Sequence, residues 1–221
     1  MINEALEKIR KEIANFPGAR LVAVSKTKPA EAVLKLYEEG QIDFGENRVQ
    51  ELEEKRESLP DNIQWHLIGS LQKNKVKYIA PYVYMIHSCD NLDLAKVISK
   101  EALKQNRVIP VLLQIKIAEE DSKQGYDIAQ LKQELDEGLI EQLPGISVHG
   151  VMGMATFTDD QMQVRKEFRQ LKTWFEELRS KYFADKLEFK EISMGMSGDY
   201  LIALEEGATM VRIGSLLFGS R

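Results

Sequence analysis

The stretch LVAVSKTKPAEAVLKLYEEG, residues 21–40, contains the clearest indication of the fold of this chain. Its first five residues, 21–25, form a short apolar run typical of a buried strand. Residues 29–40 then follow a helical apolar spacing that opens on a proline and closes on a glycine, as helix ends prefer. A buried strand followed directly by an amphipathic helix is the repeating unit of a parallel α/β protein.

The same unit recurs to the end of the chain. The pattern predicts strands at 21–25, 42–45, 64–69, 83–88, 108–117, 146–154, 187–195 and 208–215. It predicts intervening helices at 29–40, 47–59, 73–80, 91–106, 127–139, 159–182 and 198–207, and an extra helix within residues 1–16. Units of about 25 residues favour a (β/α)8 TIM barrel, with an open doubly wound sheet as the alternative. No flexible linker divides residues 1–221, so we expect a single domain.

The composition is that of an ordinary globular protein. Of 221 residues, 43% are hydrophobic and 29% are charged, and the net charge is −5. Acidic and basic residues are interspersed, which leaves no basic surface for nucleic acid. No stretch approaches the roughly 18 consecutive apolar residues of a membrane span, and the acidic N-terminus has no signal core. A lone cysteine, Cys89, excludes an internal disulfide, and we expect a cytoplasmic protein.

Small residues gather after the last two predicted strands. Ser197 and Gly198 lie in the turn after the seventh strand, and Gly214 and Ser215 follow the eighth. Backbone amides and hydroxyl groups at such turns bind anions, and TIM barrels usually hold phosphate groups after strands 7 and 8. The alternative at the first turn is that Ser197 or Asp199 only caps the next helix. Both turns together predict a phosphate ligand.

Two cationic side chains lie at predicted strand ends. Lys26 follows strand 1, and Arg212 lies near the end of strand 8, where the alternative is an ordinary edge salt bridge. An apolar barrel mouth favours the neutral form of an amine, and a neutral amine forms a Schiff base with an aldehyde. A lysine, an aldehyde and a phosphate together suggest pyridoxal 5′-phosphate (PLP), with Arg212 facing its pyridine nitrogen. Lys28 is interpreted as a solvated loop residue.

The remaining motifs carry less information. Neither a G-x-x-x-x-G-K-[ST] loop nor a G-x-G-x-x-G loop follows the first strand. The histidines His66, His87 and His149 lie on or beside different strands without the spacing of metal ligands. We therefore predict no metal site and expect barrel histidines satisfied by hydrogen bonds. Asn47, at a predicted strand-to-helix turn, either caps the helix or contacts the ligand.

Seven motifs, AVSKTKP, FGENRVQE, WHLIGSLQKNK, IHSCDN, GVMGMAT, SMGMSGDY and VRIGSLLFG, run in order between residues 20 and 219. Together they resemble the pyridoxal phosphate homeostasis protein family. The resemblance implies a fold type III barrel like the N-terminal domain of alanine racemase, with PLP held as an internal aldimine at Lys26. By the same matching, the phosphate lies at Ser197, Gly214 and Ser215, the pyridine nitrogen at Arg212, and the ring beside Asn47.

The resemblance implies a protein that buffers or delivers PLP and takes part in the control of vitamin B6 and amino-acid pools, with no established reaction. A weak PLP-dependent racemase or lyase is the first alternative, and a barrel enzyme for another phosphorylated metabolite is the second. A racemase of this fold takes a second acid or base, a tyrosine, from an added C-terminal domain in a dimer. Because this chain ends at Arg221 and nothing directs Tyr200 at a substrate, we expect a monomeric, non-catalytic carrier. Its expected partners are PLP and PLP-dependent apoenzymes.

Overall fold

The strands close into a barrel in the order of the sequence. The computed structural model describes residues 2–119 and 124–219. Its strands are β1 (Arg20–Val24), β2 (Asp43–Glu46), β3 (Gln64–Leu67), β4 (Met85–Cys89), β5 (Ile109–Gln114), β6 (Ile146–Met152), β7 (Glu191–Ser193) and β8 (Met210–Ile213). All neighbours are parallel, and β8 pairs back onto β1 with Val211 opposite Leu21. Closure confirms the predicted barrel and excludes the open sheet.

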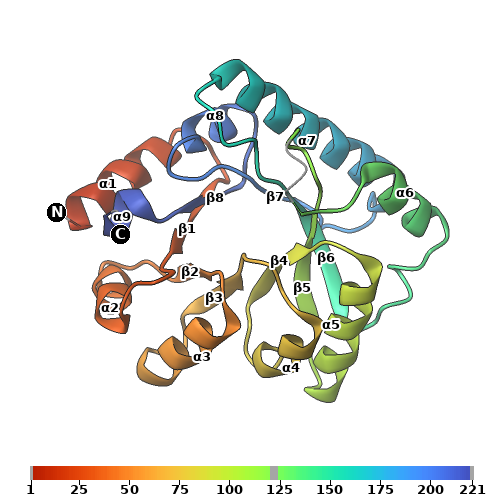
Figure 1. Ribbon diagram of the computed structural model, residues 1–221, viewed down its shortest axis with the longest axis horizontal. Coiled ribbons are helices and arrows are strands. Elements are labelled where there is room, and N and C mark those ends of the chain that lie inside the picture. Colours follow the sequence, from red (N-terminus) through yellow and green to blue (C-terminus); the bar gives the residue numbers. More distant parts are fainter. Residues whose placement is uncertain (1, 120–123, 220–221) are drawn as a thin grey trace.

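Helices surround the strands on all sides, as Figure 1 shows. They are α1 (Ile2–Ile13), α2 (Ala30–Glu38), α3 (Val49–Ser58), the 3-10 turn η1 (Lys73–Lys75), α4 (Val76–Ile79), α5 (Leu92–Lys104), α6 (Ile128–Asp136), α7 (Gln161–Tyr182), α8 (Tyr200–Glu205) and α9 (Ser215–Phe218). The extra helix predicted before the first strand is α1, and it packs against α9 (Figure 1). Within the described ranges, no helix has the length and apolar character needed to span a membrane.

Strands 7 and 8 are shorter than their apolar patterns suggest. The prediction that strand 8 reaches Ser215 is wrong, because Gly214 turns the chain into α9. Strand 7 is only three residues long instead of the predicted 187–195. Phe189, within that range, stacks on Phe175 and Phe183 with ring centroids 5.1 and 4.2 Å away. Its apolar side chain therefore packs against the end of α7 and does not extend the strand.

Apolar side chains form two separate cores. Val22, Met85, Leu112, Met152 and Met210 pack together inside the barrel. Residues that alternate with them along the strands, such as Leu21 and Val211, belong to a larger core under the helices. Polar side chains are buried inside the barrel as well, among them His66, His87, Ser193 and Arg212. The barrel interior is thus a packed core that carries a polar component.

Candidate functional site

A cleft of about 620 Å³ opens where the carboxyl ends of the strands meet. Its walls include all seven residues that the sequence predicts for the ligand site: Lys26, Asn47, Ser197, Gly198, Arg212, Gly214 and Ser215. They come from the loops after β1, β2 and β7, and from β8 and the loop after it. Barrel closure therefore brings the amine, the guanidinium and the small-residue turns to one cavity.

Lys26 lies at the exposed tip of the turn that follows β1. The amide of Lys28 donates to the carbonyl oxygen of Ser25 at 3.0 Å, and the amide of Thr27 donates to Glu51 Oε2 at 2.7 Å. Thr27 has a φ of +63°, a left-handed conformation that few non-glycine residues adopt. No residue in the described ranges hydrogen-bonds to the Lys26 side chain, so its amine is available to a ligand in the cleft.

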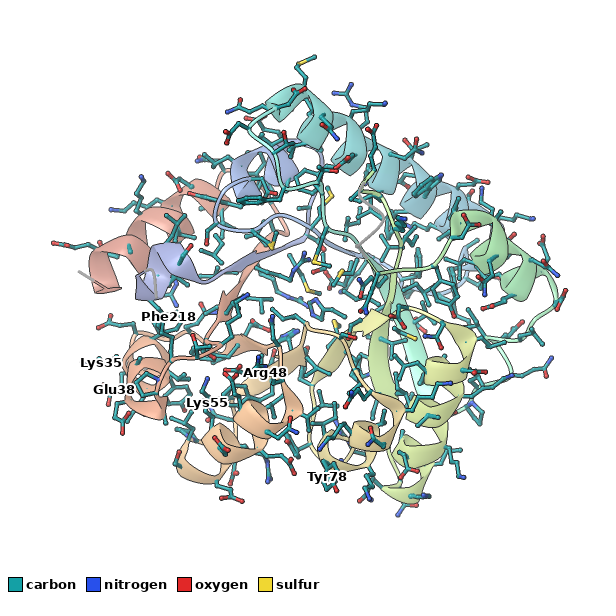
Figure 2. All side chains as sticks on the ribbon, viewed as in Figure 1. Lys35, Glu38, Arg48, Lys55, Tyr78 and Phe218 are labelled. Atoms are coloured by element: carbon teal, nitrogen blue, oxygen red, sulfur yellow. The ribbon has the colours of Figure 1, made fainter. Side chains whose placement is uncertain are left out.

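Lys28 is not the solvated loop residue that its sequence context suggests. Its Nζ donates to the carbonyl oxygens of Phe218 at 3.2 Å and Gly219 at 3.1 Å. Phe218 is the last residue of α9 (Figure 2), and the last carbonyls of a helix have no donor within the helix. Lys28 therefore ties the β1 loop to the end of α9, whose first residue, Ser215, lines the cleft.

A buried ion pair lies behind the lysine turn. Nζ of Lys55 lies 2.5 Å from Glu46 Oε1 and donates to the carbonyl oxygen of Ser25 at 2.7 Å. The Ser25 hydroxyl donates to the same carboxylate oxygen at 2.7 Å. Burial raises the pKa of the Glu46 carboxyl, and the hydrogen bond and charge of Lys55 oppose that shift. Because Lys55 belongs to α3 (Figure 2), the pair joins this helix to the ends of β1 and β2.

The turns after β7 and β8 are joined directly. The amide of Gly214 donates to Ser197 Oγ at 3.3 Å, so Ser197 does not cap α8. The Asp199 side chain does not cap α8 either, and its Oδ1 accepts from a backbone amide of the same turn at 2.5 Å. In the part of the chain that the structure describes, the backbone amides of Ser197, Gly198 and Ser215 have no acceptor. These amides and two serine hydroxyls form a set of donors suited to an anion.

Arg212 is held by two hydrogen bonds and not by an edge salt bridge. Nη1 donates to Ser193 Oγ at 2.6 Å, and Nη2 donates to the carbonyl oxygen of Gly153 at 3.1 Å. Burial lowers the pKa of the guanidinium to about 10, which leaves it charged at neutral pH. No carboxylate of a described residue forms an ion pair with Arg212, so its remaining N–H groups are available to a ligand.

Asn47 lies in the cleft wall and does not cap the helix that follows. α3 begins at Val49, after Arg48, and Arg48 caps it with no side-chain hydrogen bond. Gly69, in the loop after β3, lies directly against Asn47: a Cβ at position 69 would lie 2.3 Å from the Asn47 carbonyl oxygen. This close approach needs a glycine, and it fixes the backbone of Asn47 beside the cleft.

Several cleft residues were not assigned to the ligand site from the sequence, and one of them, Gln114, lies outside the seven motifs. Gln114, Met154, Ile68 and Ser70 line the cleft from β5 and from the loops after β6 and β3. The side-chain amide of Gln114 donates to the carbonyl oxygen of Gln124 at 2.8 Å. A polar residue at a strand end, in phase with the inward-facing residues of that strand, is the pattern that could have identified Gln114.

Two of the three histidines meet the expectation of hydrogen-bonded barrel residues. His66 Nδ1 lies 2.8 Å from His87 Nε2, and His66 Nε2 lies 2.8 Å from Asp43 Oδ1. His87 Nδ1 lies 2.9 Å from Ser193 Oγ. The side chain of His149 has no hydrogen-bond partner within the described ranges, so the expectation fails there. Within the same ranges, no group of three or more His, Cys, Asp or Glu side chains is placed to hold a metal ion.

Sequence comparison places this barrel among known proteins. Residues 2–221 match the family model described as alanine racemase, N-terminal domain. The chain is 44% identical over 204 residues to a pyridoxal phosphate homeostasis protein of Aquifex aeolicus. That alignment covers 92% of this chain and 87% of the relative. Other proteins of that name include one of Escherichia coli, at 35% identity over 207 residues.

Solved structures show the same relationship. PipY of Synechococcus elongatus, solved with PLP bound, is 36% identical and superposes with a TM-score of 0.89 over 99% of this chain and 100% of PipY. Alanine racemase of Bartonella henselae, at 14% identity, shares the fold with a TM-score of 0.73 over 61% of its length. By family model, sequence identity and coverage, the chain belongs to the pyridoxal phosphate homeostasis protein family, whose barrel is that of the alanine racemase N-terminal domain.

Proposed function

We propose that the protein binds PLP in the cleft at the carboxyl ends of its strands and acts in the homeostasis of this cofactor. One observation carries the proposal: the free amine of Lys26 shares a cavity with the anion-binding turns around Ser197 and Ser215. A cleft of about 620 Å³ is within the size range of small-molecule sites. The names of the relatives, and the PLP in PipY, support the same ligand.

The donors in the cleft fit the parts of PLP. The free amides of Gly198 and Ser215 and the hydroxyl groups of Ser197 and Ser215 would hold the phosphate, with Gly214 joining the two turns. A Cβ at Gly198 would meet no atom within 4 Å, so its backbone borders open space. Arg212 would donate to the pyridine nitrogen, which keeps that nitrogen unprotonated. Asn47 would lie beside the ring.

Lys26 is the proposed point of covalent attachment. PLP supplies an aldehyde that condenses with amines. Nζ of Lys26 would attack the aldehyde carbon, a carbon–nitrogen double bond would form, and the carbonyl oxygen would leave as water. The restrained turn around Lys26, with Thr27 bound to Glu51, limits the positions from which the amine approaches.

A carrier suits this site better than an enzyme does. Tyr200, the tyrosine nearest to the phosphate-binding turns in the sequence, donates its hydroxyl to Glu12 of α1. Burial raises the pKa of this phenol to about 12, so it stays protonated. The relatives, too, are named for homeostasis and not for a reaction. We therefore propose a single-domain, monomeric cytoplasmic carrier that buffers PLP and passes it to apoenzymes.

An absorption spectrum with borohydride reduction and peptide mapping tests the proposal. Protein incubated with PLP should show a visible band, and reduction should fix the label on the peptide that contains Lys26. Lys26→Ala should lose the band, whereas Lys35→Ala, at an exposed lysine of α2 outside the cleft (Figure 2), should keep it. A band of equal strength in Lys26→Ala would refute the attachment site, and the absence of any PLP binding would refute the proposed function.

A separate measurement tests the absence of catalysis. The holoprotein is incubated with a panel of L-amino acids in deuterated water, and Cα exchange is followed by NMR. We expect no exchange above that produced by free PLP, because the hydroxyl of Tyr200 is bound to Glu12 and Asp199 accepts from a backbone amide of its own turn, so neither is free to act as the second acid or base. Faster exchange that Lys26→Ala abolishes would instead establish a racemase-like activity.

A further inference from the structure

A continuous chain of hydrogen bonds runs through the barrel from Asp43 to Arg212. It passes from Asp43 to His66, His87, Ser193 and Arg212, with separations of 2.8, 2.8, 2.9 and 2.6 Å. Asp43 lines a second cleft, of about 290 Å³, together with residues at the amino ends of β1 and β2. Arg212 lines the ligand cleft at the opposite ends of the strands. The chain therefore links the two ends of the barrel.

The hydrogen-bond chain has one direction when both histidines are neutral. A carboxylate only accepts, so the Nε2–H of His66 must donate to Asp43, and Nδ1 of His66 must accept. Nε2–H of His87 then donates to His66, and Nδ1 of His87 must accept. The only donor left for that nitrogen is the hydroxyl proton of Ser193. Ser193 Oγ is thereby left as an acceptor, and Nη1 of Arg212 donates to it.

The surroundings favour neutral histidines. Both rings are fully buried, and burial lowers the pKa of His66 and, further, that of His87. Asp43 and Glu191 oppose the shift at His66, while the charges of Arg20 and Arg212 add to the shift at His87. The Tyr84 ring lies against the His66 ring, with ring centroids 5.2 Å apart.

We propose that Asp43, His66, His87 and Ser193 are positioning residues that fix the orientation of the Arg212 guanidinium in the ligand cleft. With its proton committed to His87, Ser193 offers Arg212 only a lone pair, so Nη1 is anchored there while Nη2 donates to Gly153, and the remaining N–H groups are left for the ligand. This inference rests on the proposed function, because the acceptor assigned to those N–H groups is the pyridine nitrogen of PLP.

The first test needs no ligand. In the apoprotein labelled with 15N-histidine, long-range 1H–15N spectra at pH 7 should show His66 and His87 neutral and protonated on Nε2. If either ring were protonated on Nδ1 or on both nitrogens, the hydrogen-bond chain would run in the opposite direction or be interrupted, and the inference would be overturned. In Asp43→Asn, whose amide can donate to His66, the Nδ1-protonated form of His66 should appear.

The second test uses the PLP-loaded protein. Ser193→Ala removes the acceptor of Arg212 and should weaken PLP binding by about fivefold, the worth of one hydrogen bond. It should also shift the pH midpoint of the visible band by about half a unit or more, and Ser193→Thr, which keeps the hydroxyl, should restore both values. Asp43→Asn should shift the pH midpoint of the visible band without changing the melting temperature. His149→Gln, at a histidine outside the hydrogen-bond chain, should leave the pH midpoint unchanged.

The outcomes separate this inference from the proposed function. If wild-type protein binds PLP but Ser193→Ala and Asp43→Asn leave the affinity and the pH midpoint unchanged, the positioning role is refuted and PLP binding stands. If wild-type protein binds no PLP, the proposed function fails and the inference fails with it. If Ser193→Ala does not fold, Asp43→Asn decides the question alone.

Discussion

Nζ of Lys28 lies 3.2 Å from the carbonyl oxygen of Phe218, so the second lysine of the β1 loop anchors the C-terminal helix α9. Lys26, two positions earlier, has no hydrogen-bond partner within the described ranges. Two lysines in one short motif therefore have different surroundings. Lys28 contributes to the position of Ser215 at the start of α9, and Lys26 leaves its amine free in the cleft.

Replacing each lysine by methionine should separate these roles. Lys28→Met should lower the free energy of unfolding by about 1–2 kcal/mol, because two charge-assisted hydrogen bonds at a partly buried site are lost. Lys26→Met should change it by no more than about 0.5 kcal/mol. Urea unfolding without PLP measures both values, and equal losses in the two variants would contradict the assignment.

Lys55→Met should be among the most destabilising single substitutions in the chain. It leaves the Glu46 carboxylate buried without its cation, which typically costs about 3–5 kcal/mol. Adding Glu46→Gln to this variant should recover a large part of the loss. Urea unfolding of the single and double variants gives the comparison.

The loss in Lys55→Met should also depend on pH. Without the cation, burial raises the pKa of Glu46 further, and a raised carboxyl pKa contributes stability that is present at low pH and lost as pH rises. The difference in unfolding free energy from wild type should therefore be smaller at pH 5 than at pH 7. A constant difference would show that Glu46 is not the group left unpaired.

The two buried histidines should make the protein less stable in mild acid. Burial lowers their pKa values when folded, whereas in the unfolded chain a histidine titrates near pH 6.5. The unfolded state then binds more protons below that pH, so stability is complete above about pH 6.5 and decreases below it. His87→Gln should flatten this slope by up to about 1.4 kcal/mol per pH unit.

Differences between wild type and His87→Gln should be measured by urea unfolding at several pH values between 5 and 7.5. Glu46, with its raised pKa, changes the pH dependence of stability in the opposite direction. Its contribution is the same in both proteins, so it cancels when one curve is subtracted from the other. Parallel curves for the two proteins would mean that His87 has the same pKa in the folded and unfolded states, and would contradict the expected shift.

Two glycines of the β7 turn should respond differently to alanine. Gly195 has a φ of +89°, and a Cβ there would lie 2.5 Å from the Cβ of Ala203, so Gly195→Ala should cost more than about 2 kcal/mol. A Cβ at Gly198 would meet nothing within 4 Å, so Gly198→Ala should fold normally. If the free amide of Gly198 binds phosphate, the added methyl group should lower PLP affinity while leaving thermal stability unchanged.

Features that depend on interactions between sequence neighbours could be predicted, whereas features that depend on contacts between distant residues could not. Strand and helix periodicities are local, so the eight strands and the helices between them follow from them. The length of β7 does not, because the apolar Phe189 packs on the aromatic rings at the end of α7. Similarly, the hydrogen bond between Lys28 and Phe218 joins residues 190 positions apart, so the residues around Lys28 could not predict it.

The sequence was enough to favour the barrel and to identify the residues at its strand ends, because apolar alternation, helix caps and small-residue turns depend on neighbouring residues. That is why Lys26, Ser197, Arg212 and Ser215 were predicted and now line one cleft. Which of their polar groups are free and which form hydrogen bonds depends on contacts between distant residues, and so became visible only in the folded barrel. The hydrogen-bond chain behind Arg212 joins β2, β3, β4, β7 and β8, and its members meet only because the closed sheet turns them toward a common interior.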